Sequence, residues 1–326
     1  MKLGSLKSPQ SLDGVLCVIS QDNKTAVKAT QAASCLREAL EQWKDKEPLL
    51  KKLYADLNAG KAEEAFAVRP SDFHSALPRT WLFADGSAFI YHIKLVRMAR
   101  KAPLPETLET VPLMYQGECG QFLAPTEDIP QRDFAHGTDF EGEVGVITDF
   151  VPMGVTPEHA LKYIRLVVLI NDVSLRGLIP EELAAGFGFF QSKPASALSP
   201  FAVTIDELGE AWQNGRLHLP LHVNYNGQFF GKANAGAMHF HFGQLIAHAA
   251  KTRNLAAGSV IGSGTVSNDS HDRGSSCLAE KRMIEQIETG AIKTSFMKSG
   301  DTVDMEMFNE QGQSIFGKIS QKVKIV

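Results

Sequence analysis

Hydrophobic and polar positions along the chain follow two different patterns, which change near residue 75. Between residues 34 and 67 the apolar positions recur at roughly helical spacing, namely Leu36, Leu40, Trp43, Leu49, Leu50 and Leu53. This spacing predicts a charge-rich helical segment. Two short β-like runs precede it, at residues 14–20 and 25–30. We therefore predict a small N-terminal α/β accessory domain over residues 1–75.

After Pro78 the pattern consists of short apolar runs separated by Gly, Pro, Asn and Asp, which is typical of strands joined by turns. The predicted strands are 143–148, 166–170, 201–205, 217–225, 259–262, 302–308 and 317–326. Helices are predicted only near residues 156–162, 242–251 and 279–288. The predicted fold class is α+β, mainly β, with the second domain over residues 76–326.

Composition excludes several classes of protein. The chain has 33 Lys and Arg against 37 Asp and Glu, a net charge of −4, without the basic excess that nucleic-acid binding needs. No apolar run reaches the roughly 18 residues of a membrane span, and no signal-peptide pattern is present, so we expect a cytoplasmic protein. The four cysteines are widely spaced, which indicates neither a disulfide framework nor a zinc ribbon. We expect Cys277 to serve packing rather than nucleophilic attack.

Two glutamates begin the strand predicted at residues 143–148. Because side chains alternate along a strand, Glu141 and Glu143 project to the same side, about 6–7 Å apart. Two carboxylates at that spacing are unfavourable unless solvent, a lysine or a cation compensates them. A divalent metal is one interpretation, and a solvated strand face is an equally good one.

Two further carboxylates extend this candidate site. Asp172 follows the apolar run 166–170, and Asp85 precedes Gly86 and Ser87. Each alone is typical of a turn or cap residue. Together the four acids offer oxygen ligands without a cysteine, a set that suits Mg²⁺ or Ca²⁺, with Mn²⁺ as a further option, rather than Zn²⁺.

The segments that carry these acids resemble the fumarylacetoacetate hydrolase family from about residue 80 to the C-terminus. The resemblance rests on eight segments in order: Asp85 followed by His92, 111–117, 139–143, 170–176, 192–200, 262–267, 274–280 and 299–303. It implies that Asp85, Glu141, Glu143 and Asp172 hold the metal. It further implies His92 as general base, Glu280 as the carboxylate that orients it, and contacts to the substrate or the developing anion from Lys193, Arg176, Tyr115 and Thr265.

The chain departs from the family pattern at three places. Gly142 separates the two glutamates where the family usually has an apolar residue. Ile179 stands where longer members place a substrate-binding glutamine, and Gln191 is the candidate replacement for it. The interval from Lys193 to Ser199 is about one residue shorter than in longer members, which counts against a pocket role for Ser196.

The function implied by the resemblance is hydrolysis of a C–C bond in a β-diketo acid. We expect the acid to be 4-fumarylacetoacetate, giving fumarate and acetoacetate in tyrosine breakdown, and the enzyme to be a homodimer. Alternatives are acylpyruvate or fumarylpyruvate hydrolysis, oxaloacetate decarboxylation, an isomerase step in aromatic-acid breakdown, or a non-catalytic metabolite-binding protein. The position of His92, just after Asp85, favours the first function.

Other histidines invite a metal-site interpretation that we do not adopt. His239 and His241 are two residues apart, but no acid is near and a helix is expected from Phe242, so structural roles are predicted for both. His136 precedes the glutamate strand and is expected to be a loop residue. The spacing of His271, in a polar loop, does not indicate a lid role.

Overall fold

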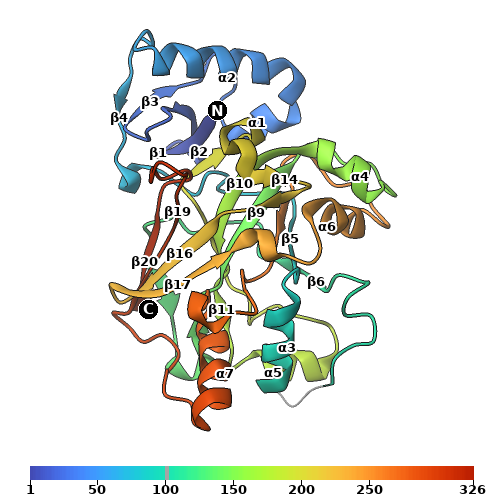
Figure 1. The fold of residues 1–326 in the computed structure, drawn as a ribbon. Helices are drawn as coiled ribbons and strands as arrows, with labels where there is room; N and C mark the ends of the chain where they lie inside the picture. The colour runs from blue at the N-terminus through green and yellow to red at the C-terminus, as the bar shows by residue number, and fades with distance from the viewer. Residues whose placement is uncertain (100–102) are drawn as a thin grey trace.

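The structure is a computed structural model that describes residues 1–99 and 103–326, and it is built around two large β-sheets (Figure 1). The larger sheet has the order β4 (Phe66–Ala67), β3 (Thr25–Lys28), β2 (Ser11–Ile19), β1 (Lys2–Ser8), β13 (Phe201–Val203), β10 (Ile164–Asn171), β9 (Gly142–Thr148), β18 (Val260–Gly262), β5 (Phe83–Gly86) and β6 (Met114–Gly117), with β12 (Ala197–Leu198) beside β10. The second sheet has the order β17 (Gln228–Asn234), β16 (Pro220–Tyr225), β19 (Thr302–Met307), β20 (Ile319–Ile325) and β7 (Ile129–Gln131). Two short pairs complete the strands, β8 (Thr138–Asp139) with β11 (Ser174–Leu175) and β14 (Trp212–Gln213) with β15 (Arg216–Leu217).

The helices lie around these sheets. They are α1 (Leu36–Glu41), α2 (Trp43–Asn58), α3 (Ile90–Ala99), α4 (Pro157–Ala160), α5 (Ile179–Ala185), α6 (Phe242–Ala249) and α7 (Leu278–Thr289). Figure 1 shows α2 at one end of the molecule, beside the N-terminal strands, with α3, α5 and α7 gathered at the other end. The predicted α+β, mainly β fold class is confirmed. Among the described residues, no helix combines the length and the apolar character that crossing a bilayer requires.

The N-terminal segment differs in detail from the pattern predicted for it. The helical pattern of residues 34–67 resolves into α1 and α2 and ends at Asn58, where Ala59 and Gly60 turn the chain and Gly60 has a φ of 69°. Strand β1 was not predicted, yet it pairs with β13 and so joins the N-terminal strands to the large sheet. The domain boundary at residue 75 stays a prediction.

The strands predicted after residue 75 are confirmed as β9, β10, β13, β16, β18, β19 and β20, within a few residues at their ends. The restriction of helices to three segments was wrong, because α3 and α5 are also helical. On α3 the apolar residues Ile93 and Leu95 are buried while Lys94 is exposed. A dense apolar segment of this kind suits a strand or a packed helix equally well, and only its tertiary neighbours decide.

Strand pairing brings the predicted acids to one place. In the antiparallel pair of β9 and β10, Glu143 lies opposite Ile170, and the Asp172 N–H donates to the Glu141 carbonyl at 2.9 Å. On the other side of β9, β18 pairs in parallel with β5, which places Gly262 opposite Asp85. The register of four neighbouring strands therefore assembles the candidate site.

Gly142 has a packing reason in this arrangement. A Cβ atom at this position would lie 2.9 Å from Cδ2 of Leu221 on the neighbouring strand β16. Since such a distance is shorter than normal van der Waals contact, a larger residue would require the Leu221 side chain to shift. The glycine allows the glutamate strand and β16 to approach closely.

Candidate active site

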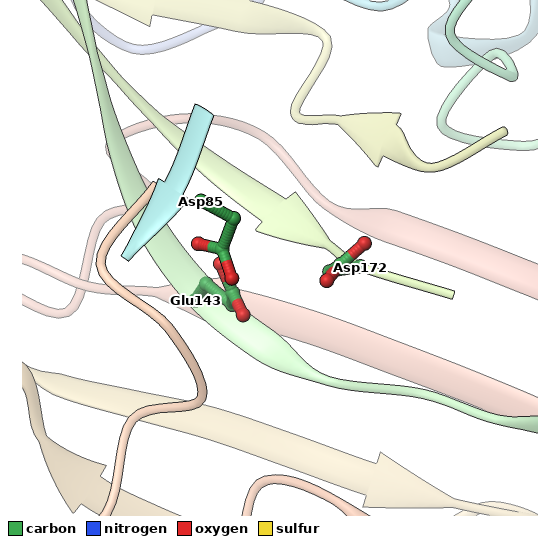
Figure 2. A group of neighbouring side chains, drawn as sticks. All are labelled: Asp85, Glu143 and Asp172. Atoms are coloured by element: carbon green, nitrogen blue, oxygen red, sulfur yellow. The ribbon is translucent and has the colours of Figure 1, made fainter. Parts of the chain in front are cut away.

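Three carboxylates from three strand ends form the centre of the site (Figure 2). Asp85 comes from β5, Glu143 from β9, and Asp172 follows β10; each offers a ligand oxygen, and these oxygens lie within 4.8 Å of one another. All three residues are buried, with exposed fractions of 4%, 0% and 1% respectively. Such a cluster of buried like charges requires compensation.

The donor atoms fit a hard divalent cation. Neither carboxylate oxygen of Glu143 has a hydrogen-bond partner within the described part of the chain. Burial, followed by the charge of Asp85, raises the pKa of Glu143 well above its ordinary value, and burial together with Asp172 raises the pKa of Asp85 to about 8. Buried carboxylates without partners are costly, and carboxylate oxygens are the preferred ligands of Mg²⁺ and Ca²⁺. Glu143, Asp85 and Asp172 are thus suited to hold such an ion.

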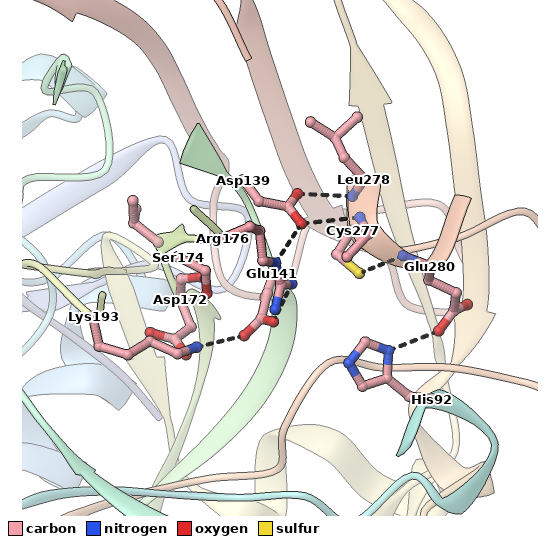
Figure 3. Close-up of polar contacts among 12 residues, drawn as sticks. His92, Asp139, Glu141, Asp172, Ser174, Arg176, Lys193, Cys277, Leu278 and Glu280 are labelled. Carbon is pink, nitrogen blue, oxygen red and sulfur yellow. Dashed lines mark hydrogen bonds and ion pairs between the residues drawn. The ribbon is translucent and has the colours of Figure 1, made fainter. Parts of the chain in front are cut away.

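Glu141, the fourth predicted ligand, lies beside this cluster and contacts two cations (Figure 3). Its Oε1 accepts from Nη2 of Arg176 at 2.5 Å, and its Oε2 accepts from Nζ of Lys193 at 2.8 Å. Burial alone would raise the pKa of Glu141, but Arg176 and Lys193 outweigh burial and hold it well below its ordinary value. Glu141 is therefore ionised, and its role as a metal ligand stays a prediction.

Lys193 links Glu141 to the three-acid cluster. Its Nζ also lies 2.5 Å from Oδ2 of Asp172, and it sits 4.9 Å from the centre of the Tyr115 ring. Burial lowers the pKa of Lys193, but the charges of Asp172 and Glu141 raise it by a larger amount. The net shift of the pKa is therefore upward, and the ammonium stays charged. Asp172 also accepts from the hydroxyls of Tyr115 at 2.5 Å and Ser196 at 2.7 Å.

His92 and Glu280 form a second pair of the site and come from two different helices. Nδ1 of His92, on α3, lies 2.9 Å from Oε2 of Glu280, near the start of α7. Glu280 is buried, and its other oxygen has no partner among the described residues. Figure 3 shows the second ring nitrogen of His92 turned toward the side chains of Glu141 and Lys193. The arrangement is that of a base held by a carboxylate.

Asp139 is a residue of the site to which the sequence assigned no role. Its Oδ2 accepts from Nε of Arg176 at 2.9 Å and from the Ala279 N–H at 3.0 Å, while Oδ1 accepts from the Leu278 N–H at 2.8 Å. A carboxylate at the first turn of a helix is stabilised by the unpaired N–H groups there. Asp139 therefore connects Arg176 to the start of α7, which carries Glu280.

These side chains border a cavity of about 330 Å³. Its lining includes seven of the predicted residues: Asp85, His92, Tyr115, Glu141, Arg176, Lys193 and Thr265. Glu143 and Asp172 do not line the cavity, but each has a carboxylate oxygen within 4.8 Å of an oxygen of Asp85, which does. Gln191 is exposed, does not line the cavity, and donates its backbone N–H to Glu182 at 2.6 Å. Ile179 does line the cavity.

The residues set aside in the sequence have defined contacts in the structure. Nδ1 of His241 accepts from the Gly243 N–H and caps α6, and Nε2 of His239 lies 2.9 Å from the Glu109 carbonyl. Cys277 is buried at the start of α7, where its Sγ accepts from the Glu280 N–H, and burial raises the pKa of its thiol well above its ordinary value. The cap agrees with the structural role predicted for His241, and the burial of Cys277 agrees with its predicted packing role, whereas the role of the exposed His239 stays a prediction.

The sequence matches two family models that together cover nearly all of the chain. Residues 82–324 match the model described as fumarylacetoacetate (FAA) hydrolase C-terminal, and residues 1–79 match fumarylacetoacetase N-terminal domain 2. The second match covers the segment that the sequence motifs left unassigned.

Curated relatives share part of this chain. A 2,4-didehydro-3-deoxy-L-rhamnonate hydrolase of Sphingomonas sp. is 28% identical over 167 residues, which are 50% of this chain and 54% of that protein. An oxaloacetate tautomerase of Bacillus subtilis is 22% identical over 218 residues, which are 66% of this chain and 62% of that protein. The matches thus span between about half and two thirds of the length of these relatives.

Solved structures share the whole fold. The maleylpyruvate hydrolase of Sphingobium sp. SYK-6 superposes with a TM-score of 0.67 at 13% identity, with both chains fully covered. The fumarylacetoacetate hydrolase of psychrophilic Exiguobacterium antarcticum gives a TM-score of 0.64 at 17% identity, also with both chains fully covered. At these identities the likeness concerns the fold alone.

Proposed function

The chain belongs to the fumarylacetoacetate hydrolase family, and from that premise we propose that it is a metal-dependent hydrolase that cleaves a C–C bond of a β-diketo acid. The observation that carries the proposal is the pair of His92 and Glu280, 2.9 Å apart, with His92 lining the same cavity as Asp85 of the buried group of three carboxylates. A base and a cation site in one cavity are what hydrolytic C–C cleavage needs.

The pair supplies the base. When the N–H at Nδ1 of His92 donates to Glu280, Nε2 carries no proton and can take one from a water molecule. The imidazolium formed in that step is then stabilised by the carboxylate of Glu280. Because Glu280 is buried, water does not compete with His92 for its carboxylate.

Charge that develops on the departing group must also be stabilised. A divalent cation held by Asp85, Glu143 and Asp172 would supply Lewis-acid stabilisation of the enolate that leaves. Lys193 adds a fixed positive charge at the cavity wall. Its ammonium has three N–H donors, and contacts with Glu141 and Asp172 account for two of them, so one remains for a substrate oxygen.

4-Fumarylacetoacetate is the reference compound for the assay, because it has the β-diketo acid head that this chemistry requires and its cleavage would give fumarate and acetoacetate. Acylpyruvates have a related head and are the next acids to test. The homodimeric state and the cytoplasmic location stay predictions.

Tautomerisation and decarboxylation are competing activities within the family, and the similarity to an oxaloacetate tautomerase keeps the first under test. Neither reaction consumes water. The position of His92 against Glu280 favours an attacking water, because the pair provides for its deprotonation. A non-catalytic metabolite-binding protein would have no use for this pair.

Hydrolysis in ¹⁸O-labelled water separates these activities. The proposal expects loss of the diketone absorbance and formation of two acids by mass spectrometry, one of them carrying a single new ¹⁸O atom. Oxaloacetate and acylpyruvates are compared in the same assay. Release of CO₂ would favour decarboxylation instead of hydrolysis, and isomerisation without cleavage would favour tautomerisation.

A further inference from the structure

The residues that line the cavity fall into two groups of different chemistry. The polar group consists of the side chains connected to the carboxylates, such as His92, Tyr115 and Lys193. The remaining wall is largely apolar and comes from helices α3 and α5 and the segment after α5. Five of its residues define what we call the apolar wall: Ile93, Val96, Ile179, Leu183 and Phe189.

Helical spacing presents these side chains to the cavity. On α5, Ile179 and Leu183 are four residues apart and therefore lie on one face of the helix. Ile93 and Val96 are three residues apart on α3 and likewise share a face. Ile179 and Ile93 are buried, with 2% and 6% exposed, whereas Leu183 is 44% exposed and lies nearer the mouth. The wall thus extends from the interior of the cavity toward solvent.

Charged groups are sparse among the described residues of this wall. Among the described lining residues, Arg97 is the one charged side chain that does not take part in the network around the carboxylates. Its Nη1 donates to the Pro103 carbonyl at 2.8 Å. Phe189 packs edge-on against Tyr115, with ring centres 5.3 Å apart, so the apolar wall adjoins the polar group.

We infer that this wall selects a β-diketo acid whose acyl tail is apolar and uncharged, an alkyl or aryl group, with Ile179 and Leu183 as specificity-determining residues. The inference rests on the proposed function and narrows its substrate class away from the fumaryl tail of 4-fumarylacetoacetate. Burying one more methylene against such a wall strengthens binding about fourfold, equivalent to about 0.8 kcal/mol. A tail that ends in a carboxylate loses hydration there, which weakens its binding.

Binding measurements test this inference separately from turnover. Acids with one common head and butanoyl, pentanoyl or fumaryl tails are titrated calorimetrically, with Mg²⁺ present, into the His92→Ala variant, which is expected to turn over slowly. The expected Kd falls about fourfold from butanoyl to pentanoyl, and both acids bind at least about tenfold more tightly than the fumaryl acid. A fumaryl acid that binds most tightly overturns the inference.

Wall variants identify the residues responsible. In the same background, Leu183→Gln and Ile179→Gln are each expected to weaken the pentanoyl acid at least about fivefold and to leave the fumaryl acid within about twofold. Ile292→Gln, at an exposed isoleucine that does not line the cavity, serves as the matched control and changes neither. Because Leu183 is partly exposed, its variant keeps the test valid even if Ile179→Gln unfolds.

Two outcomes separate a failure of this inference from a failure of the proposed hydrolase function. If Arg97→Gln abolishes a preference for the fumaryl acid, the tail contact is ionic and the inference is wrong. If the predicted binding order holds but the wild-type protein hydrolyses none of the acids, the inference stands and the proposed hydrolase function fails.

Discussion

His92 and Glu280 come from different helices and meet through Nδ1 and Oε2 at 2.9 Å. Helices α3 and α7 are held together by an apolar cluster that includes Leu95, Met283 and Ile284. The cluster fixes the distance between the two helices, so the histidine and the carboxylate meet without a direct connection along the chain. The proposed base therefore depends on helix packing as well as on its own hydrogen bond.

Glu280→Gln is expected to lower kcat about 10- to 100-fold while KM stays close to the wild-type value. The amide keeps the shape and an acceptor for Nδ1–H but loses the charge that stabilises the imidazolium. Steady-state kinetics across pH measure the effect. A rise in KM with unchanged kcat would assign Glu280 to substrate binding instead.

Glu143→Gln is expected to weaken Mg²⁺ binding at least about 100-fold, because it removes a charge from a ligand whose oxygens are otherwise unpartnered. Calorimetric titration of the EDTA-treated protein gives the affinity, and turnover should be lost on chelation and restored by Mg²⁺ or Mn²⁺. Glu310→Gln, at an exposed glutamate, is the matched control. Full activity of protein without detectable metal contradicts this account.

The pKa of Asp85 predicts how the metal-free protein responds to pH. Its folded-state pKa of about 8 exceeds the ordinary value of 3.8. Between these two pH values, the folded protein therefore binds the proton of Asp85 more tightly than the unfolded chain does. The free energy of unfolding contributed by Asp85 is therefore highest below pH 3.8 and is lost as pH rises toward 8. We expect the Tm in EDTA to fall from pH 5 to pH 8, and Mg²⁺ to reduce that fall.

Thermal unfolding of Asp85→Asn checks this assignment, since the amide cannot titrate. Its Tm in EDTA should depend less on pH than that of the wild-type protein. An unchanged pH dependence in this variant would show that other groups, such as Glu143, cause the effect.

Asp139→Asn should lower the free energy of unfolding by about 3–5 kcal/mol, the usual cost of removing the charge of one partner from a buried ion pair. Asp139 is fully buried, and Arg176, its partner, also contacts Glu141. Chemical denaturation provides the measurement, with Asp45→Asn at an exposed aspartate of α2 as the control. Equal losses in the two variants would remove Asp139 from the framework of the site.

Strand periodicity and motif order made much of this site predictable. Glu143 was predictable because a strand places alternate residues on one face, and Asp172 because it directly follows an apolar run that became β10. Their meeting follows from antiparallel pairing of neighbouring strands, which is a local feature of the sheet.

Contacts between distant segments could not be predicted in the same way. The helical state of α3 depends on its packing against α7, since its apolar residues suit either secondary structure. The role of Asp139 depends on the start of α7, which lies 139 residues away in sequence. The apolar wall was missed for a similar reason, because α5 was not predicted as a helix and its face could not be assigned.

The kcat of His92→Ala, measured with its Mg²⁺ affinity, tests the central claim most directly. If His92 deprotonates the attacking water, kcat for the β-diketo acid falls about 10²- to 10⁴-fold, and the Kd for Mg²⁺ stays within about twofold of wild type because the three clustered carboxylates are intact. The acidic limb of the pH profile of kcat/KM disappears in the same variant. Near-normal turnover by His92→Ala would contradict the hydrolase mechanism and favour an activity that needs no attacking water.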